Sequence, residues 1–219
     1  MRRFYIWYSK RLSASDFFFA LLEDGNFNQP KHLIIEMKPL DIRLREVIRD
    51  IADFPKPGIL FKDITPILID ANLCRDIVDE MHAAFQPIKI DGIVGVESRG
   101  FLFGLMLAQK FNVPFIPIRK KGKLPYKTVS YEYTLEYGTA TMEMHSDAIS
   151  SGANFLVHDD LLATGGTAAA AAELIKLQNG NVAGFAFLVG LDFLNGKNML
   201  SKYSTDIKTL ISYSWDMNI

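Results

Sequence analysis

The chain has 219 residues and a formal net charge of −1, with 49% hydrophobic and 22% charged residues. This size and balance suit one globular domain, or one domain with a small appendage. Near-neutral charge gives no electrostatic reason to expect a nucleic acid or a membrane as partner, although local basic residues can hold a small anion. No apolar run approaches the roughly 20 residues that span a bilayer. The single cysteine, Cys74, allows no internal disulfide, so we expect a cytoplasmic protein.

The first 36 residues differ from the rest of the chain. Aromatic residues cluster there without a helical or strand period, and Gly25-Asn26 breaks the segment. The basic residues near its start precede only a short apolar stretch that runs into Glu23-Asp24, which makes a poor secretory signal. Residues 1–36 are either a peripheral arm or an extension ahead of a true start at Met37, and we favour the extension. The main domain then spans residues 37–219.

The first regular element is predicted at residues 39–53, where apolar side chains recur at helical spacing. Phe54-Pro55-Lys56-Pro57-Gly58 ends this helix, because two prolines and a glycine cannot continue it. A second helix is predicted at residues 72–85.

From residue 91 onward, short apolar runs alternate with helical patterns. The pattern predicts strands at 93–96, 115–118, 155–157, 182–191 and 207–213, and helices at 101–111 and 167–177. Such alternation indicates an α/β fold, with a parallel twisted sheet of about five strands flanked by helices. Ligands of these sheets bind beyond the carboxyl ends of the strands. The candidate site therefore comprises the loops at 97–100, 119–123 and 159–167.

The third of these loops has the composition of a sugar-phosphate site. Small and hydroxyl residues form its second half, which reads Ala163, Thr164, Gly165, Gly166 and Thr167. The glycines let backbone N–H groups approach an anion closely, and the helix that follows adds partial positive charge. At the other end of the loop, the carboxylates of Asp159 and Asp160 can accept hydrogen bonds from vicinal sugar hydroxyls.

Basic residues follow two of the predicted strands. Arg99, next to Ser98, can form paired hydrogen bonds to phosphate oxygens. Arg119, Lys120 and Lys123 come after the next strand. A run of this kind is usually a solvated surface, but its place at a strand end favours a second contact with an anionic ligand.

The string Asp159–Thr167 resembles the phosphoribosyl pyrophosphate signature of type I phosphoribosyltransferases, in the form found in adenine-specific members. Three further stretches agree with this family in order, at residues 54–66, 97–104 and 119–125. The resemblance covers roughly residues 38–213. His158 departs from the usual apolar residue at its position, and we assign it no chemistry.

The resemblance implies transfer of the 5-phosphoribosyl group from phosphoribosyl pyrophosphate to adenine, giving AMP and pyrophosphate. Mg²⁺ would be carried by the substrate rather than by a protein cage. The family pattern assigns the phosphoribosyl group to Asp159, Asp160 and Ala163–Thr167. It assigns pyrophosphate to Ser98, Arg99, Arg119, Lys120 and Lys123. It assigns adenine to Leu60, Phe61, Lys62 and Leu161. It also implies a small hood, a cis peptide at Glu97–Ser98 and a homodimer.

The segment at 131–138 is polar and aromatic, which suggests a mobile flap that closes over the site. The general acid/base glutamate of the family falls on Glu136, beside Tyr137 in the flap. Glu132 is the competing candidate. The alternative for the whole segment is a β-hairpin whose acidic side chains simply face solvent.

Two other functions remain open from the residues. The first is transfer to another base, such as hypoxanthine, guanine or xanthine. Ala163 argues against it, because inosine-type enzymes commonly carry an aspartate there. The second is a regulator that senses phosphoribosyl pyrophosphate and binds DNA. The segment 1–36 is too short and aromatic for a helix-turn-helix, and the pI of 6.4 offers no basic face.

Overall fold

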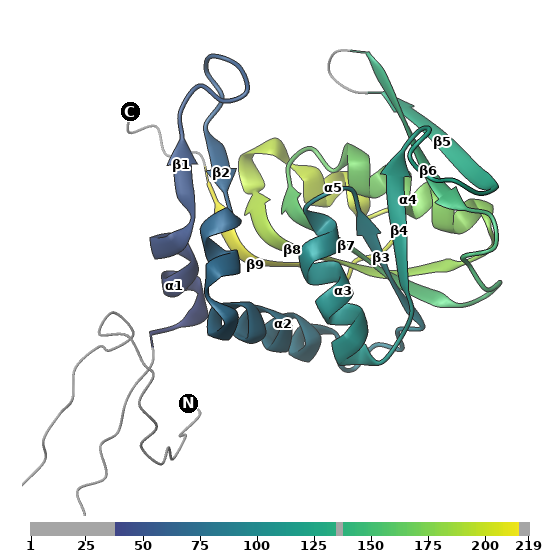
Figure 1. The fold of residues 1–219 in the computed structure, drawn as a ribbon, viewed down its shortest axis with the longest axis horizontal. Helices are drawn as coiled ribbons and strands as arrows, with labels where there is room; N and C mark the ends of the chain where they lie inside the picture. Colours follow the sequence, from purple (N-terminus) through teal and green to yellow (C-terminus); the bar gives the residue numbers. More distant parts are fainter. Residues whose placement is uncertain (1–37, 135–137, 215–219) are drawn as a thin grey trace, which may run out of the picture. The chain divides into compact units, whose positions relative to one another are not determined.

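The computed structural model describes residues 38–134 and 138–214 (Figure 1). It divides into two compact units, Met1–Asp63 and Ile64–Ile219. The arm predicted at 1–36 lies outside the described residues.

The described part of the first unit is one short helix and one hairpin. α1 spans Leu40–Val47, and the strands β1 (Arg49–Ile51) and β2 (Phe61–Asp63) pair antiparallel. Lys62 Nζ lies 2.6 Å from Asp50 Oδ1 across this ladder, and the Phe54 and Phe61 rings meet edge to face. This hairpin occupies the part of the sequence where the resemblance implies the hood.

The prediction of one helix over residues 39–53 was wrong in its second half. The chain turns extended at Ile48, with φ −66° and ψ 127°, and residues 49–51 form a strand. Residues 49–51 are extended because they pair with residues 61–63. The spacing of apolar residues within 39–53 carries no information about this partner strand.

The second unit is built on a seven-stranded sheet in the order β5-β6-β4-β3-β7-β8-β9. Five strands run parallel: β3 (Gly92–Val96), β4 (Phe115–Lys120), β7 (Asn154–Leu162), β8 (Asn181–Leu191) and β9 (Ile207–Tyr213). They confirm the five predicted strands, although β7 continues to Leu162, past its predicted end at 157, and so includes the first residues of the predicted loop 159–167. The hairpin of β5 (Thr128–Thr134) and β6 (Thr139–His145) extends the sheet antiparallel beside β4.

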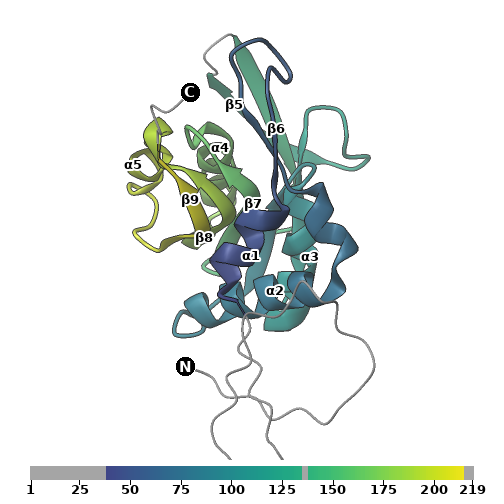
Figure 2. The same cartoon turned by 90° about the vertical axis from the view of Figure 1, so that its left-hand side faces the viewer.

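Helices cover both faces of this sheet, as the predicted α/β fold requires. α2 (Ala71–Phe85) and α3 (Gly100–Phe111) lie on one face, and α4 (Gly166–Leu177) lies on the other (Figures 1 and 2). Three short helices complete the second unit: η2 (Thr65–Ile69), η3 (Asp192–Leu194) and α5 (Gly196–Leu200). None of the helices in the described residues is long and apolar enough to cross a bilayer.

The core under α4 follows from the alternation of side chains along the strands. Val94 of β3, Val157 of β7 and Phe185 of β8 are fully buried there, with Ala171 and Leu174 of α4. The alanines of α4 let the helix lie close to the sheet, which fixes the position of its first turn. That turn is the end of the candidate phosphate loop.

His158 lies on β7 and is fully buried. Its Nδ1–H donates to the carbonyl oxygen of Ala186 at 2.9 Å, and its Nε2 has no hydrogen-bond partner among the described residues. A Cβ at Gly104 would lie 3.5 Å from Cδ2 of this ring, an ordinary contact, but only 2.9 Å from Cε2 of Phe115, so the glycine makes room for the Phe115 ring. Burial lowers the pKa of His158 from 6.5 to about 4.

This histidine should make stability depend on pH. Between pH 6.5 and about 4 the unfolded chain binds a proton at His158 that the folded chain excludes, so stability falls as pH falls. Because each tenfold change in proton affinity is worth about 1.4 kcal/mol, we expect a loss approaching about 3 kcal/mol. Urea unfolding of wild type and His158→Val, compared from pH 7.5 to 4, measures it. Parallel pH curves for the two proteins would contradict the expectation.

Candidate active site

Three predicted loops meet at one edge of the sheet. β4, β3 and β7 are parallel neighbours, so their carboxyl ends lie side by side. Residues 97–100 follow the end of β3, whereas the segments 119–123 and 159–167 begin within the last residues of β4 and β7 and continue past their ends. The structure thus brings together the residues predicted for the phosphoribosyl group and for pyrophosphate.

An ion pair joins two of these loops. Arg99 Nε lies 2.9 Å from Asp160 Oδ2, and only 6% of the Asp160 side chain is exposed. Burial raises the pKa of Asp160, and the Arg99 guanidinium opposes that rise without cancelling it. The residue predicted to bind pyrophosphate therefore orients one of the residues predicted to bind ribose.

Asp159 is half-buried beside this pair. Its Oδ1 accepts a hydrogen bond from the backbone N–H of Asp160 at 2.9 Å. A Cβ at Gly100 would lie 2.9 Å from the same oxygen, so α3 can begin here because its first residue is glycine. Burial, and then the negative charge of Asp160, raise the pKa of Asp159 well above its usual value. Positive charge that develops on a bound ribose would favour the ionised carboxylates.

The turn after β3 contains the cis peptide between Glu97 and Ser98 that the resemblance implies. Glu97 also holds the basic loop. Its Oε2 accepts from Arg119 Nε at 3.0 Å and from the backbone N–H of Lys120 at 3.1 Å. Burial opposes ionisation of Glu97, but these hydrogen bonds prevail and lower its pKa. The guanidinium is thereby fixed at the strand end where pyrophosphate is expected.

A second carboxylate supports the same loop from the hairpin. Glu143 of β6 is 7% exposed, and its Oε2 accepts from the backbone N–H of Gly122 at 3.0 Å. Arg119 Nη1 also donates to the carbonyl oxygen of Lys123 at 3.1 Å, which closes the loop on itself. The supporting roles of Glu97 and Glu143 were not predicted from the sequence. Of these two roles, only that of Glu97 has a signal in the sequence, which is its place in the motif at 97–104.

The phosphate loop ends in the left-handed residue Gly165, with φ +86°, and α4 begins at Gly166. Thr164 is exposed at this turn, and Thr167 is half-buried. The Thr167 hydroxyl lies 3.5 Å from the Tyr133 hydroxyl of β5. The first N–H groups of α4 and the residues Thr164 and Thr167 therefore belong to the same turn, where a phosphate was predicted.

The remaining predicted residues are placed less fully. Leu60, Phe61 and Lys62 belong to the first unit, and Leu161 lies on β7 in the second. Glu136 and Tyr137 lie outside the described residues. Their roles therefore stay predictions. The strands on either side of them form the β5–β6 hairpin.

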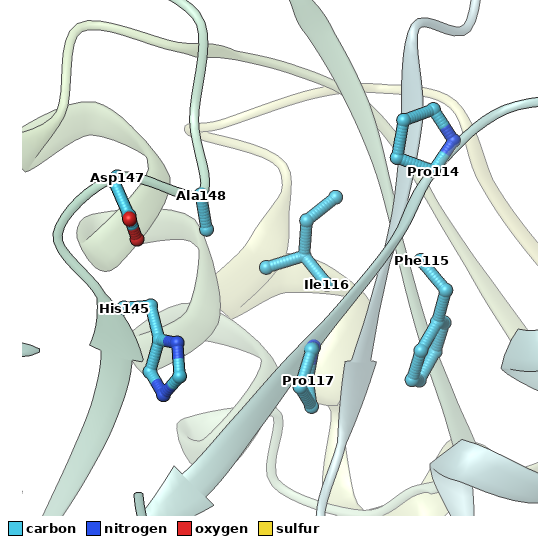
Figure 3. Close-up of a pocket in the computed structure, with 7 residues that line it drawn as sticks. All are labelled: Pro114, Phe115, Ile116, Pro117, His145, Asp147 and Ala148. Carbon is cyan, nitrogen blue, oxygen red and sulfur yellow. The ribbon is translucent and has the colours of Figure 1, made fainter. Parts of the chain in front are cut away.

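A pocket of about 340 Å³ lies elsewhere in the second unit (Figure 3). Its lining includes Phe115 and Pro117 of β4, His145 at the end of β6, and Asp147. β4 and β6 pair only at Arg119 and Lys120, so the strands leave this space at the amino end of β4. No lysine or arginine is among the described residues that line the pocket, and it lies at the opposite end of β4 from the candidate site. It does not suit a phosphate.

A family model described as a phosphoribosyl transferase domain matches residues 62–219. The chain therefore belongs to the phosphoribosyltransferase family, in agreement with its parallel sheet and strand-end loops. The adenine phosphoribosyltransferase of Cytophaga hutchinsonii is 52% identical over 174 residues, which are 80% of this chain and 96% of that protein. Within the family, the chain belongs with the adenine phosphoribosyltransferases.

Solved structures agree with this assignment. The crystal structure of the Thermoanaerobacter pseudethanolicus adenine phosphoribosyltransferase has a TM-score of 0.77 and 47% identity, covering 80% of this chain and 100% of that one. The Saccharomyces cerevisiae enzyme, solved with adenine and an imino-altritol bisphosphate, has a TM-score of 0.72 and 40% identity, covering 78% and 98%.

Proposed function

We propose that this protein transfers the 5-phosphoribosyl group from phosphoribosyl pyrophosphate to adenine and releases AMP and pyrophosphate. The observation that carries the proposal is the loop Asp159–Thr167, which joins a pair of carboxylates to the first turn of α4 at the carboxyl end of β7. The loop has the family signature, and relatives about 50% identical are adenine-specific by name.

The second unit offers complementary charge for such a transfer. The glycosidic bond breaks through a state with positive charge on the ribose ring and negative charge on pyrophosphate. Asp159 and Asp160 would face the first charge, and Arg99 and Arg119 the second. Arg99 pairs with Asp160, and Arg119 pairs with Glu97, so both guanidinium groups are held in place and less reorganisation is needed when substrate binds. Ser98, Lys120 and Lys123 complete the proposed pyrophosphate contacts.

Mg²⁺ fits this arrangement as a partner of the substrate. No group of three histidine, cysteine or acidic side chains among the described residues could form a metal cage. Asp160 and Glu97 accept from arginines instead. Mg²⁺ is commonly held by substrate phosphates with one or two carboxylates, so the pyrophosphate oxygens would carry it. Bound there, it would neutralise charge on the leaving group.

Adenine recognition is proposed from the family match. Leu60, Phe61, Lys62 and Leu161 would contact the base, and Glu136, beside Tyr137, would exchange the proton of its attacking nitrogen. Ala163 stands where inosine-type enzymes commonly carry aspartate, which favours adenine.

Turnover of each free base tests the proposal. With phosphoribosyl pyrophosphate and Mg²⁺, we expect AMP from adenine, and a preference of roughly 100-fold or more over hypoxanthine, guanine and xanthine. Product chromatography measures the ratio. Equal turnover of hypoxanthine would show that the base assignment is wrong, whereas a gel shift without any turnover would favour the DNA-binding regulator.

We also propose a homodimer, by analogy with the family. α3 exposes Leu102 and Leu105 (40% and 51%), which offers an apolar surface to a second copy. Light scattering tests the homodimer, because a monomer mass at working concentration would exclude it. The cytoplasmic location stays a prediction that rests on the single cysteine.

A further inference from the structure

The segment after β8 packs backbone to backbone against the phosphate loop. A Cβ at Gly196, the first residue of α5, would overlap the carbonyl oxygen of Ala163 and lie 2.8 Å from Leu162 Cδ1. A Cβ at Gly165 would lie 2.9 Å from the carbonyl oxygen of Gly196. Backbone atoms cannot rotate away as a side chain can. Any side chain at residue 196 must therefore displace either α5 or the loop.

α5 is the more firmly held of the two. Leu200, at its end, is fully buried in the core cluster under α4. Just beyond the helix, the Tyr203 hydroxyl donates to Glu173 Oε1 of α4 at 2.5 Å, and the Tyr203 ring packs edge to face against Phe185. These contacts fix the short helix to α4 and the sheet at the end away from Gly196.

The loop is less deeply buried at this point. Ala163 is only half-buried and Thr164 is exposed. A push from residue 196 would therefore move Ala163–Gly165 rather than the anchored helix. Gly165 immediately precedes the first turn of α4, so its displacement would misplace the N–H groups that converge on the phosphate position.

We propose that Gly196 is a positioning residue for phosphoribosyl pyrophosphate. Its bare backbone supports Ala163–Gly165 and sets the geometry of the first N–H groups of α4. The inference rests on the proposed role of Asp159–Thr167 as the phosphoribosyl site, and it adds a residue some 30 positions further along the chain that acts through the loop.

Kinetics of Gly196→Ala in the full-length protein test the inference. Since a displacement of about 1 Å can cost up to 10²-fold, we expect KM for phosphoribosyl pyrophosphate to rise between about 10- and 100-fold. KM for adenine should stay within about threefold, because the loop's distortion is confined to the phosphate end. A structural defect alone would not separate the two constants.

Gly184→Ala is the matched control. A Cβ at Gly184 would lie 2.6 Å from the backbone oxygen of Asp206, so this variant carries a similar clash near the amino end of β8. It should lower the melting temperature while leaving KM for phosphoribosyl pyrophosphate within about threefold of wild type. Thr167→Ala, inside the loop, serves as the reference that should raise this KM directly.

The outcomes distinguish the role of Gly196 from the assignment of the loop as the phosphoribosyl site. If Thr167→Ala raises KM for phosphoribosyl pyrophosphate and Gly196→Ala does not, the role of Gly196 is overturned and the loop assignment stands. If neither variant changes it, the loop assignment fails as well. Equal rises in both Michaelis constants of Gly196→Ala, matched by Gly184→Ala, would also overturn the inference.

A milder variant covers the case in which Gly196→Ala does not fold. Tyr203→Phe keeps the ring but removes its hydrogen bond to Glu173, which loosens the anchor of α5. We expect a rise of roughly five- to tenfold in KM for phosphoribosyl pyrophosphate, less than direct loss of a hydrogen bond to a charged carboxylate would cause, because the effect reaches the loop only through α5. An unchanged KM in a folded Tyr203→Phe protein would overturn the inference.

Discussion

Replacing Glu136 by glutamine is expected to lower kcat about 10²–10⁴-fold, the usual contribution of a general acid or base. The amide is nearly isosteric with the carboxyl group, so substrates should still bind, but it cannot exchange the proton that adenine loses. KM for phosphoribosyl pyrophosphate should therefore stay within about threefold. The expectation rests on the family match of residues 131–138, because Glu136 itself lies outside the described residues.

Glu132→Gln provides the matched control from the same segment. Glu132 is exposed on β5, opposite Thr141 of β6, and its substitution should change kcat by less than about threefold. Both variants should be measured at several pH values. A Glu136→Gln enzyme within threefold of wild type, or a larger loss from Glu132→Gln, would contradict the assignment. A change confined to KM for adenine would assign Glu136 to base binding instead.

The parallel part of the fold was predictable because its signals are local. β3, β4, β7 and β8 each contain an apolar run that begins or ends near turn residues. The helices α2, α3 and α4 begin one residue before their predicted starts. Antiparallel pairing is different, since it depends on a partner strand. That is why residues 49–51 were assigned to a helix, and why the β5–β6 hairpin was only an alternative.

The grouping of the three candidate-site loops was predictable for a similar reason. The carboxyl ends of neighbouring parallel strands meet, so three loops could be grouped from the strand pattern alone. The contacts that orient their side chains could not be predicted. Glu97 reaches Arg119 across 22 positions, and Gly196 meets Ala163 from the segment after another strand. Arg99 and Asp160 were each assigned to a different part of the substrate, which concealed their pairing with one another.

That pairing leads to the second large expected effect. Arg99→Ala and Asp160→Asn should each lower kcat/KM for phosphoribosyl pyrophosphate roughly 10- to 150-fold. This is the range for loss of a hydrogen bond to a charged group, about 1.5–3 kcal/mol. Initial rates at saturating adenine measure it. Unchanged kinetics in either variant would remove that residue from the site.

Stability of the same two variants and of their double mutant tests whether the ion pair presets the site. In Arg99→Ala the Asp160 carboxyl stays buried without its guanidinium, which raises its pKa further. When the pKa of a carboxyl group is higher in the folded than in the unfolded chain, the free energy of unfolding falls as pH rises through the folded pKa. Arg99→Ala should therefore be less stable at pH 8 than at pH 5. We expect Arg99→Ala to lose about 1–3 kcal/mol of stability at pH 8, less than for a fully buried pair because Arg99 is partly exposed.

The double mutant Arg99→Ala/Asp160→Asn should recover much of this stability, with a coupling energy of about 1–2 kcal/mol by urea unfolding. Additive losses, equal at both pH values, would show that Arg99 and Asp160 act on substrate independently.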